Sequence, residues 1–247
     1  MSQFSDDLFL GTAQTFMGLN SSLGNPSPMG LGVGPMGRIY VWDTVPLALG
    51  AANIAAASVW TGAITLTAAT GTTQVVRQDG GVVIQLDVPR AVSITTGAGT
   101  VTNRNVTISG YDVYGQPMSE VIATGTVQST TVNGKKAFYQ ISSATISGSA
   151  VVTVSVGTTD IFGSPARITN AGYIDRAGWN NTLAEDAGTF VAAVTTTATT
   201  TSGDVRGTYV PSSAADGAKR LVMGILLPAI AVGPQATRTG ALGVTQA

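Results

Sequence analysis

The sequence predicts an all-β protein, a β-sandwich or jelly-roll-like fold of antiparallel sheets with an extended N-terminal arm. Short segments that alternate apolar and polar residues recur about every 8 to 12 residues between turn signals. No long segment has the apolar spacing of an amphipathic helix. Two such sheets would bury their apolar faces against each other about 10 Å apart, which is the arrangement of a sandwich.

The arm is expected over residues 1–38. Ser5 could cap a short helix there, with Asp6 and Asp7 in its first turn. The following residues, 21–37, have no periodicity and are rich in glycine, proline and methionine. The arm is therefore either a disordered tail or an extended segment that packs on a neighbouring subunit.

Large apolar side chains favour the packed arm, because solvated tails are poor in aromatic residues. The candidate contact residues of the arm are Phe4, Leu8, Phe9, Phe16, Met17, Met29 and Met36. The glycine-rich run Gly30–Gly37 does not match a nucleotide-binding loop, since no strand precedes it and no helix follows it.

The β-sandwich region is expected over residues 39–232, with a division into two sub-domains allowed near Ala98. Pro46 and Pro89 are expected to end strands, because proline cannot donate to a ladder. The alanine-rich segment Ala48–Ser58 fits either a helical turn or a small-residue strand. The strands expected before residue 98 are Arg38–Val45, Val59–Ala68, Thr72–Arg77, Val82–Val88 and Ala91–Thr95, with a hairpin turn at Asp79-Gly80-Gly81.

Residues Val101–Gly163 carry the clearest alternation. Val106 and Ile108 share one face of a strand, which ends at a turn over 112–115 where Asp112 bonds its own backbone. Asn133-Gly134 is expected as a hairpin turn. The valines at 152, 154 and 156 predict a half-buried strand, after which the chain turns away over 157–160.

This order of strands and turns resembles a pattern found in structural proteins of tailed-bacteriophage virions. The pattern has a G-x-D-x-x-G turn, an acidic return strand, a G-x-K-A-F strand and a V-x-V-G-x-x-D-x-x-G-x-P ending. The matching residues are Gly110, Asp112 and Gly115, then Glu120, Gly134–Phe138 and Val154–Pro165, with a further similar segment at Ser202–Pro211. The resemblance implies a capsid decoration (cement) protein or a related virion structural protein.

A decoration protein would bind the outer surface of a phage head and stabilise it. The resemblance implies the major capsid protein and further copies of this chain, as a dimer or trimer, as partners. The location would be the virion surface, after synthesis in the host cytoplasm. The alternatives are a tail, neck or fibre-associated protein, a carbohydrate-binding module or a secreted adhesin. Aromatic residues for a sugar platform would be Trp60, Tyr111, Tyr114 and Trp179.

Beyond the central stretch, strands are expected over Arg167–Asn170 and Thr189–Thr195, with irregular chain over Gly172–Asp186. Tyr209-Val210 and Leu221–Leu227 are expected to pair around a turn at 216–217. The apolar run Leu221–Val232 is too short for a membrane helix and is expected to be a buried strand. Residues 233–247 are expected to form a polar, mobile C-terminal tail.

Charged residues make up 10% of the chain, against about 25% in ordinary soluble domains, and the net charge is −1. We therefore expect neither a nucleic-acid partner nor a membrane partner. The N-terminus lacks a basic and apolar signal sequence, which also disfavours the adhesin. A neutral surface suits permanent assembly, although secreted β-proteins share it.

We expect no enzymatic activity, no cofactor and no metal. The chain has no cysteine and no histidine, which removes thiolate chemistry, the commonest general base and the commonest metal ligand. Asp112 and Glu120 flank a hairpin, but a turn aspartate and a solvated strand glutamate explain them. Adjacent Glu185 and Asp186 usually point apart. The remaining aspartates expected at turns are Asp160, Asp175, Asp204 and Asp216.

Overall fold

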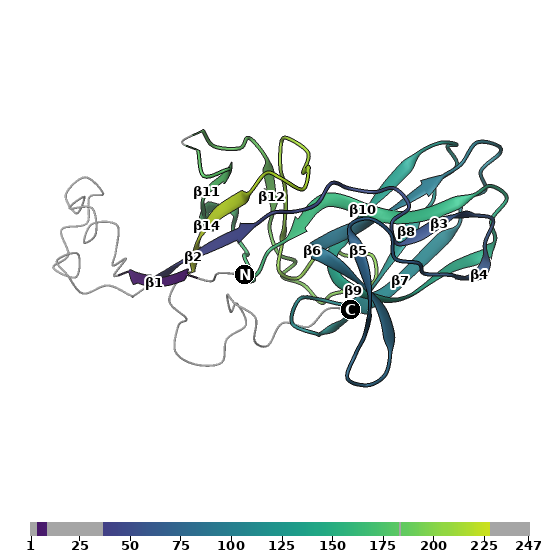
Figure 1. Cartoon of the computed structure of the whole chain (residues 1–247), viewed down its shortest axis with the longest axis horizontal. Coiled ribbons are helices and arrows are strands. Elements are labelled where there is room, and N and C mark those ends of the chain that lie inside the picture. Colours follow the sequence, from purple (N-terminus) through teal and green to yellow (C-terminus); the bar gives the residue numbers. More distant parts are fainter. Residues whose placement is uncertain (1–3, 9–36, 183, 228–247) are drawn as a thin grey trace.

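The computed structural model describes residues 4–8, 37–182 and 184–227, which form an elongated molecule built from two antiparallel sheets (Figure 1). The described residues contain β-strands and a single 3₁₀ turn, Ala171–Tyr173. The predicted all-β, sandwich-like antiparallel fold is confirmed. Among the described residues, no helix is long and apolar enough to cross a membrane.

The larger sheet has ten strands and forms the sandwich lobe. Along its main path the strand order is β12-β13-β10-β6-β9-β7-β8, while β3, β4 and β5 pair with β10, β9 and β6. The strands are β3 (Ala55–Ser58), β4 (Thr61–Ile64), β5 (Thr72–Val76), β6 (Val82–Thr96), β7 (Asn105–Tyr111), β8 (Pro117–Ala123), β9 (Thr131–Ser149), β10 (Val154–Gly163), β12 (Thr189–Val191) and β13 (Thr208–Val210).

Two long strands curl this sheet around its core. The first part of β6 pairs with β5, and its second part pairs with β10 and with the start of β9. The far end of β9 pairs instead with β4 and β7. The buried apolar side chains that this curl encloses form the sandwich core, in which Ile108, Phe138 and Ile141 are fully buried.

The smaller sheet has four strands in the order β1-β2-β14-β11. Its strands are β1 (Phe4–Leu8), β2 (Gly37–Thr44), β11 (Ile174–Trp179) and β14 (Leu221–Leu227). In β14, Leu221, Met223 and Ile225 are fully buried, so the expectation of a buried strand is confirmed over Leu221–Leu227, and residues 228–232 of the predicted run lie outside the described residues.

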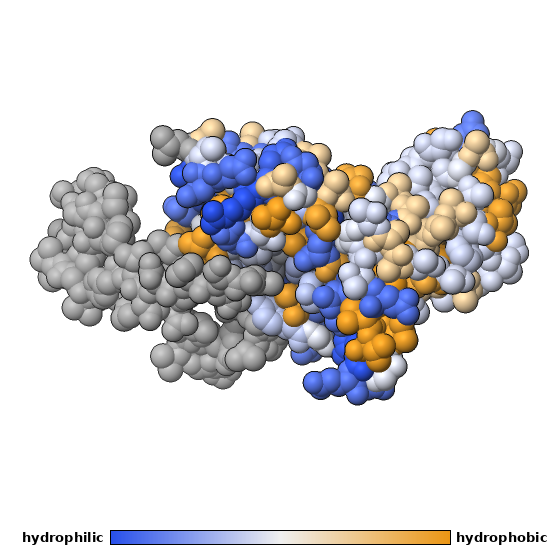
Figure 2. Space-filling view, in the orientation of Figure 1, coloured by the Kyte–Doolittle hydropathy of each residue, from blue (hydrophilic) through white to orange (hydrophobic). Residues whose placement is uncertain are grey.

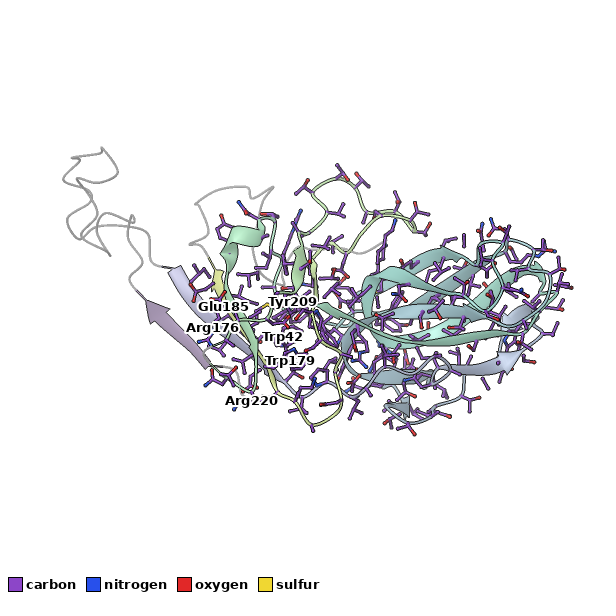
Figure 3. All side chains as sticks on the ribbon, turned by 90° about the horizontal axis from the view of Figure 1, so that it is seen from above. Trp42, Arg176, Trp179, Glu185, Tyr209 and Arg220 are labelled. Carbon is purple, nitrogen blue, oxygen red and sulfur yellow. The ribbon has the colours of Figure 1, made fainter. Side chains whose placement is uncertain are left out.

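A second apolar cluster, the junction core, lies where the small sheet meets the sandwich lobe. Figure 3 shows Trp42, Trp179 and Tyr209 close together there. Its buried residues come from both sheets: Trp42, Val88, Phe162, Ala166, Ile168, Ala177, Tyr209, Ala215, Leu221, Met223 and Ile225. The two lobes therefore share one set of packing contacts.

Several predicted turns lie within strands. Pro89 does not end its strand, because β6 continues through it at a point where the ladders to β9 and β10 both shift register. Asn133-Gly134 lies inside β9. Residues 157–160 continue β10, which is buried on both faces and not half-buried as expected.

The later part of the chain also differs from expectation. The segment predicted as irregular contains β11, and residues 167–170 form no strand. The predicted pair does not form, since β13 pairs with β10 and β12 whereas β14 pairs with β2 and β11. The loop at Ala98 joins β6 and β7, which both pair with β9 in the same sheet.

At the N-terminus, the prediction of a helix starting at Ser5 is wrong. Residues Phe4–Leu8 form β1, an added edge strand paired in register with β2. The hydrogen bonds offered by the open edge of β2 outweigh the favourable capping residue, because a short isolated helix is marginal in water.

Candidate assembly surface

The free end of the small sheet gathers chain segments from both ends of the sequence. Leu8 is paired with Gly37, and Arg38 with Leu227. Residues 9–36 and 228–247, which lie outside the described residues, are therefore attached side by side at this end. Residues 9–36 contain no charged side chain, and residues 228–247 contain only Arg238. These two segments, which contain one charged side chain between them, thus join the fold at one place, remote from β3 and β4 (Figure 1).

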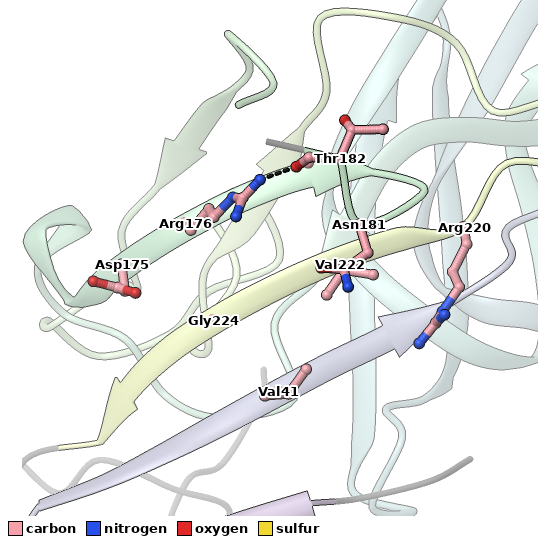
Figure 4. Close-up of a pocket in the computed structure, with 9 residues that line it drawn as sticks. Val41, Asp175, Arg176, Asn181, Thr182, Arg220, Val222 and Gly224 are labelled. Carbon is pink, nitrogen blue, oxygen red and sulfur yellow. Dashed lines mark hydrogen bonds between the residues drawn. The ribbon is translucent and has the colours of Figure 1, made fainter. Parts of the chain in front are cut away.

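Beside this end, the outer face of the small sheet carries a groove of about 360 Å³ (Figure 4). Val41 and Val222 supply apolar surface from β2 and β14, on the face opposite the junction core. Gly178 and Gly224 line the groove without a side chain. A Cβ on Gly224 would touch Asp175, at 3.7 Å from its nearest carboxylate oxygen, and would take up part of the groove.

The polar rim of the groove comes from β11, the turn after it and the start of β14. Its members are Asp175, Arg176, Asn181, Thr182 and Arg220. The rim therefore offers both charges around an apolar floor.

Both rim arginines already have partners. The guanidinium of Arg220 donates to both carboxylate oxygens of Asp43, and this hydrogen bonding raises the pKa of Arg220. Arg176 donates to the carbonyl of Thr182 (Figure 4). Asp175 is exposed at a register shift in β11, and no ion pair joins it to another described residue. Among the residues that the structure describes, none forms an ion pair with this carboxylate of the groove.

The turn after β11 is held by two asparagines in the left-handed conformation, Asn180 at φ 55° and Asn181 at φ 53°. Asparagine tolerates this conformation better than most residues. The N–H of Asn180 donates to the carbonyl of Arg220 at 2.6 Å, and the N–H of Arg220 donates to Asn180 Oδ1 at 3.0 Å. This exchange fixes the rim of the groove against the start of β14.

Buried charges form a second feature, where the segment 199–207 lies against β7, β8 and β9. Asp112 and Arg206 form an ion pair of 2.8 Å with both side chains 2% exposed. Asp204 accepts from the N–H of Ala137 at 2.9 Å and of Arg206 at 2.7 Å. Asp112 also accepts from the backbone N–H groups of Tyr114 and Gln116, so the predicted turn around it is confirmed.

Glu120 belongs to the same network, and the expectation that it is solvated is wrong. Its side chain is 3% exposed and accepts from the N–H of Lys135 at 2.6 Å and of Lys136 at 3.2 Å. Burial raises the pKa of Glu120 to about 7, against the opposing effect of these hydrogen bonds and of the two lysine charges. Burial also lowers the pKa of Lys136, which Glu120 and Asp204 oppose. These groups are committed to one another, and Lys135 and Asp204 also line a hollow of about 150 Å³.

A further buried cation, Arg90, lies between the two cores. It is 0% exposed, donates to the carbonyl of Leu47 at 3.0 Å and lies 3.4 Å from Asp87 and 3.5 Å from Asp160. Burial lowers the pKa of Arg90, although both carboxylates oppose this change. Its guanidinium also lies over the ring of Phe162, in the junction core.

Glu185 and Asp186 separate, as expected for neighbours. Glu185 is exposed, whereas Asp186 accepts from the Tyr209 hydroxyl at 2.6 Å and from the N–H of Ser212 at 2.9 Å. Burial tends to raise the pKa of Asp186, but the hydrogen bonds from Ser212 and Tyr209 outweigh it and lower the pKa. Within the described ranges, no group of three acidic side chains is placed to bind a metal.

The predicted aromatic platform is dispersed. Trp60 packs against the sandwich core and donates to the carbonyl of Val154 at 2.8 Å, whereas Trp179 packs against the junction core. Tyr111 and Tyr114 are covered by Arg77 and Arg206, respectively. The four rings do not form one stacking surface.

Of the predicted contact residues, only Phe4 and Leu8 fall in a described element, at the two ends of β1. Phe9, Phe16, Met17, Met29 and Met36 lie outside the described residues. Sequence reasoning missed the groove, although the alternation of Val41 with Trp42 and of Val222 with Met223 is the signal of a second, outward face.

Comparison with protein-family models, with curated proteins and with solved structures found no match to this chain.

Proposed function

We propose that the protein is a virion structural protein that decorates the outer surface of a phage head and attaches to it through the free end of the small sheet. The observation that carries the proposal is the attachment beside one another at that end of residues 9–36, which carry no charge, and residues 228–247, which carry one. The resemblance of Val101–Gly163 and Ser202–Pro211 to virion proteins gives the class of particle.

Uncharged segments suit attachment for a physical reason. A segment with apolar side chains and no charge buries surface against a partner without the cost of desolvating ions. Residues 9–36 carry Phe9, Phe16 and three methionines, which fit irregular grooves. A stable interface of about 1,200 to 2,000 Å² is of a size that such a segment supplies when it lies along a partner.

The edge position of β1 adds a second way to make contact. β1 pairs with β2 on one side only, so its other edge has unpaired backbone groups among the described strands. A strand of a partner that extends this edge would add main-chain hydrogen bonds. The proposed partners are the major capsid protein and further copies of this chain, as a dimer or trimer.

Deletion of residues 1–36 tests the attachment. The deletion removes the arm with β1 but leaves β2, β14, β11 and the junction core. We expect a folded protein, measured by circular dichroism and thermal unfolding, that no longer co-sediments with emptied capsids of the parent phage.

A matched control changes the opposite end of the molecule. Val59 and Val151 are 55% and 59% exposed near β3, β4 and the start of β10. The full chain with Val59→Ser and Val151→Ser is expected to bind capsids like the unchanged protein. Equal capsid binding by the deletion variant would refute the role of the arm. Binding to isolated tails instead of capsids would assign the protein to the tail or neck of the particle.

A further inference from the structure

The groove on the small sheet lacks a covering element among the described residues. Val41, Val222 and Leu226 are only half-buried on a sheet face whose other side is fully packed. Exposed apolar sheet faces mark contact sites, because soluble proteins rarely leave contiguous apolar surface uncovered. The groove has a volume of about 360 Å³, against about 210 Å³ for the hollow near Leu47 and about 150 Å³ for the hollow near Gly134.

We propose that residues 228–247 of the same chain turn back and occupy this groove, with Arg238 paired to Asp175. The proposal concerns the isolated protein and does not depend on the virion function. It assigns the groove to a segment that begins at the end of the strand forming its floor.

The chain length permits this contact. At about 3.3 Å per residue, Gly224 lies about 10 Å and Arg220 about 23 Å along β14 from Leu227. Pro228 cannot extend the ladder of β14, so the chain can leave the sheet directly after Leu227. Residues 228–238 can span up to about 36 Å, whereas Asp175 lies beside Ile225 and Gly224, about 7 to 10 Å back along β14 from Leu227. A reversal soon after Pro228 therefore leaves enough chain for Arg238 to reach Asp175.

The charges of the two partners are complementary. Asp43 compensates Arg220, and Arg176 binds the carbonyl of Thr182, which leaves Asp175 as the carboxylate of the groove without an ion pair to a described residue. Arg238 is the single charged side chain of residues 228–247. The rest of that segment is neutral and includes the apolar residues Ile230, Val232 and Leu242, which suit the floor formed by Val41 and Val222.

Covalent attachment favours this segment over one from a second molecule. A short flexible connection gives an effective concentration on the order of millimolar, which a second copy at micromolar concentration does not match. In dilute solution, residues 228–247 of the same chain therefore occupy the groove in preference to a segment of a second copy.

Disulfide trapping in the naturally cysteine-free chain tests the proposal. Val222→Cys places a thiol on the floor of the groove, and Gln235→Cys, Thr237→Cys or Thr239→Cys places the second thiol in the segment. We expect an intramolecular disulfide under mild oxidation, mapped by peptide mass spectrometry, at a rate independent of protein concentration. The matched control moves the first cysteine to Val76, which is 67% exposed on the β5–β6 hairpin, and should react at least about tenfold more slowly.

Charge reversal gives a second readout. Arg238→Glu is expected to slow trapping roughly two- to fivefold, as expected for an exposed ion pair, and Asp175→Arg in the same chain should restore the rate. Equal trapping by Val222→Cys and Val76→Cys would overturn the proposal. So would dimers linked only between molecules, which would assign the groove to a second copy. Preferential trapping of Val222→Cys by Gln14→Cys would assign it to residues 9–36.

Discussion

The sandwich lobe and the small sheet differ in how they close their cores. The sandwich core is enclosed by strands of a single curled sheet, in which β5–β6, β7–β8 and β12–β13 pair as sequence neighbours and the other pairings join more distant strands. The small sheet joins β2 to β14, from opposite ends of the described chain, and its junction core needs Phe162 and Tyr209 from the other sheet. The core of the sandwich lobe is therefore closed within one sheet, whereas the small sheet buries its apolar face only by packing against the sandwich lobe.

This difference has consequences for folding and for contacts. Pairing between distant segments has a high loop-closure cost, so we expect the small sheet to form last and to open first. Residues 9–36 and 228–247 are attached to that less independent part, and the groove lies on it. We therefore expect the strands beside the groove to exchange their amide hydrogens faster than the sandwich lobe does.

The surface shows a related contrast. Figure 2 shows apolar residues on the β5–β6 hairpin, where Val76 and Val82 are exposed beside the polar turn at Asp79. Such single exposed valines are common on soluble proteins. The groove differs because it is a hollow on a sheet face, with the apolar residues Val41 and Val222 in its lining.

The largest expected effect breaks the sandwich core. Phe138→Ala removes a fully buried ring and should lower the free energy of unfolding by about 3–5 kcal/mol. Hydrogen exchange should rise throughout both sheets, since the small sheet depends on the lobe. Met223→Ala, the matched change in the junction core, should raise exchange mainly in β2, β11 and β14. If both variants raised hydrogen exchange in the same strands, the two lobes would not be independent units.

A somewhat smaller effect concerns the buried ion pair. Arg206→Met leaves the carboxylate of Asp112 buried without its cation and should destabilise the fold by about 3 kcal/mol in urea unfolding. The cost falls at the low end of the usual range because Asp112 keeps its hydrogen bonds from Tyr114 and Gln116. Asp112→Asn combined with Arg206→Met should recover part of the loss, and a purely additive double variant would contradict the pairing.

Stability should also depend on the ionisation of Glu120. The pKa in the folded state is about 7, above the ordinary value of 4.5, so folding favours the protonated form. The resulting stabilisation is complete below pH 4.5 and is lost as the pH rises through 7. Its size is on the order of 1–3 kcal/mol.

The free energy of unfolding, measured from pH 4.5 to 8, checks this dependence. Glu120→Gln removes the titrating group beside Lys135, Lys136 and Asp204 and should flatten the slope between pH 4.5 and 7. An unchanged slope in Glu120→Gln would assign the dependence to another group.

The smallest expected effect lies on the rim of the groove. The pair between Arg220 and Asp43 is exposed, so Arg220→Ala should change stability only slightly in urea unfolding, and the change should shrink at high salt. A loss as large as that of Arg206→Met would show that the small sheet relies on surface charge.

The fold class follows from local pattern, because alternation in segments such as 105–111 reports burial directly. Turn signals were less informative where glycine serves packing. A Cβ on Gly134 would lie 2.6 Å from a carboxylate oxygen of Glu120, so this glycine admits the buried carboxylate within β9 and makes no turn. At Gly157 a Cβ would lie 2.0 Å from the carbonyl oxygen of Gly50, which requires glycine inside β10.

The groove and the charge network could not be predicted from the sequence, for a different reason. Both are assembled by pairing between distant segments: Val41 with Gly224, and Asp112 with Arg206. The spacing of residues within one segment does not indicate contacts between distant segments. The prediction that aspartates 112 and 204 support turns was sound, but the arginine and the backbone groups that bury them come from elsewhere in the chain.

Electron cryo-microscopy of capsids decorated with the full chain tests the central claim most directly. The account predicts density for the small sheet against the capsid surface, with residues of the arm lying along a capsid subunit and the β3–β4 end of the sandwich lobe pointing away. Density in which the β3–β4 end contacts the shell while the small sheet faces solvent, or capsids that carry no additional density, would contradict it.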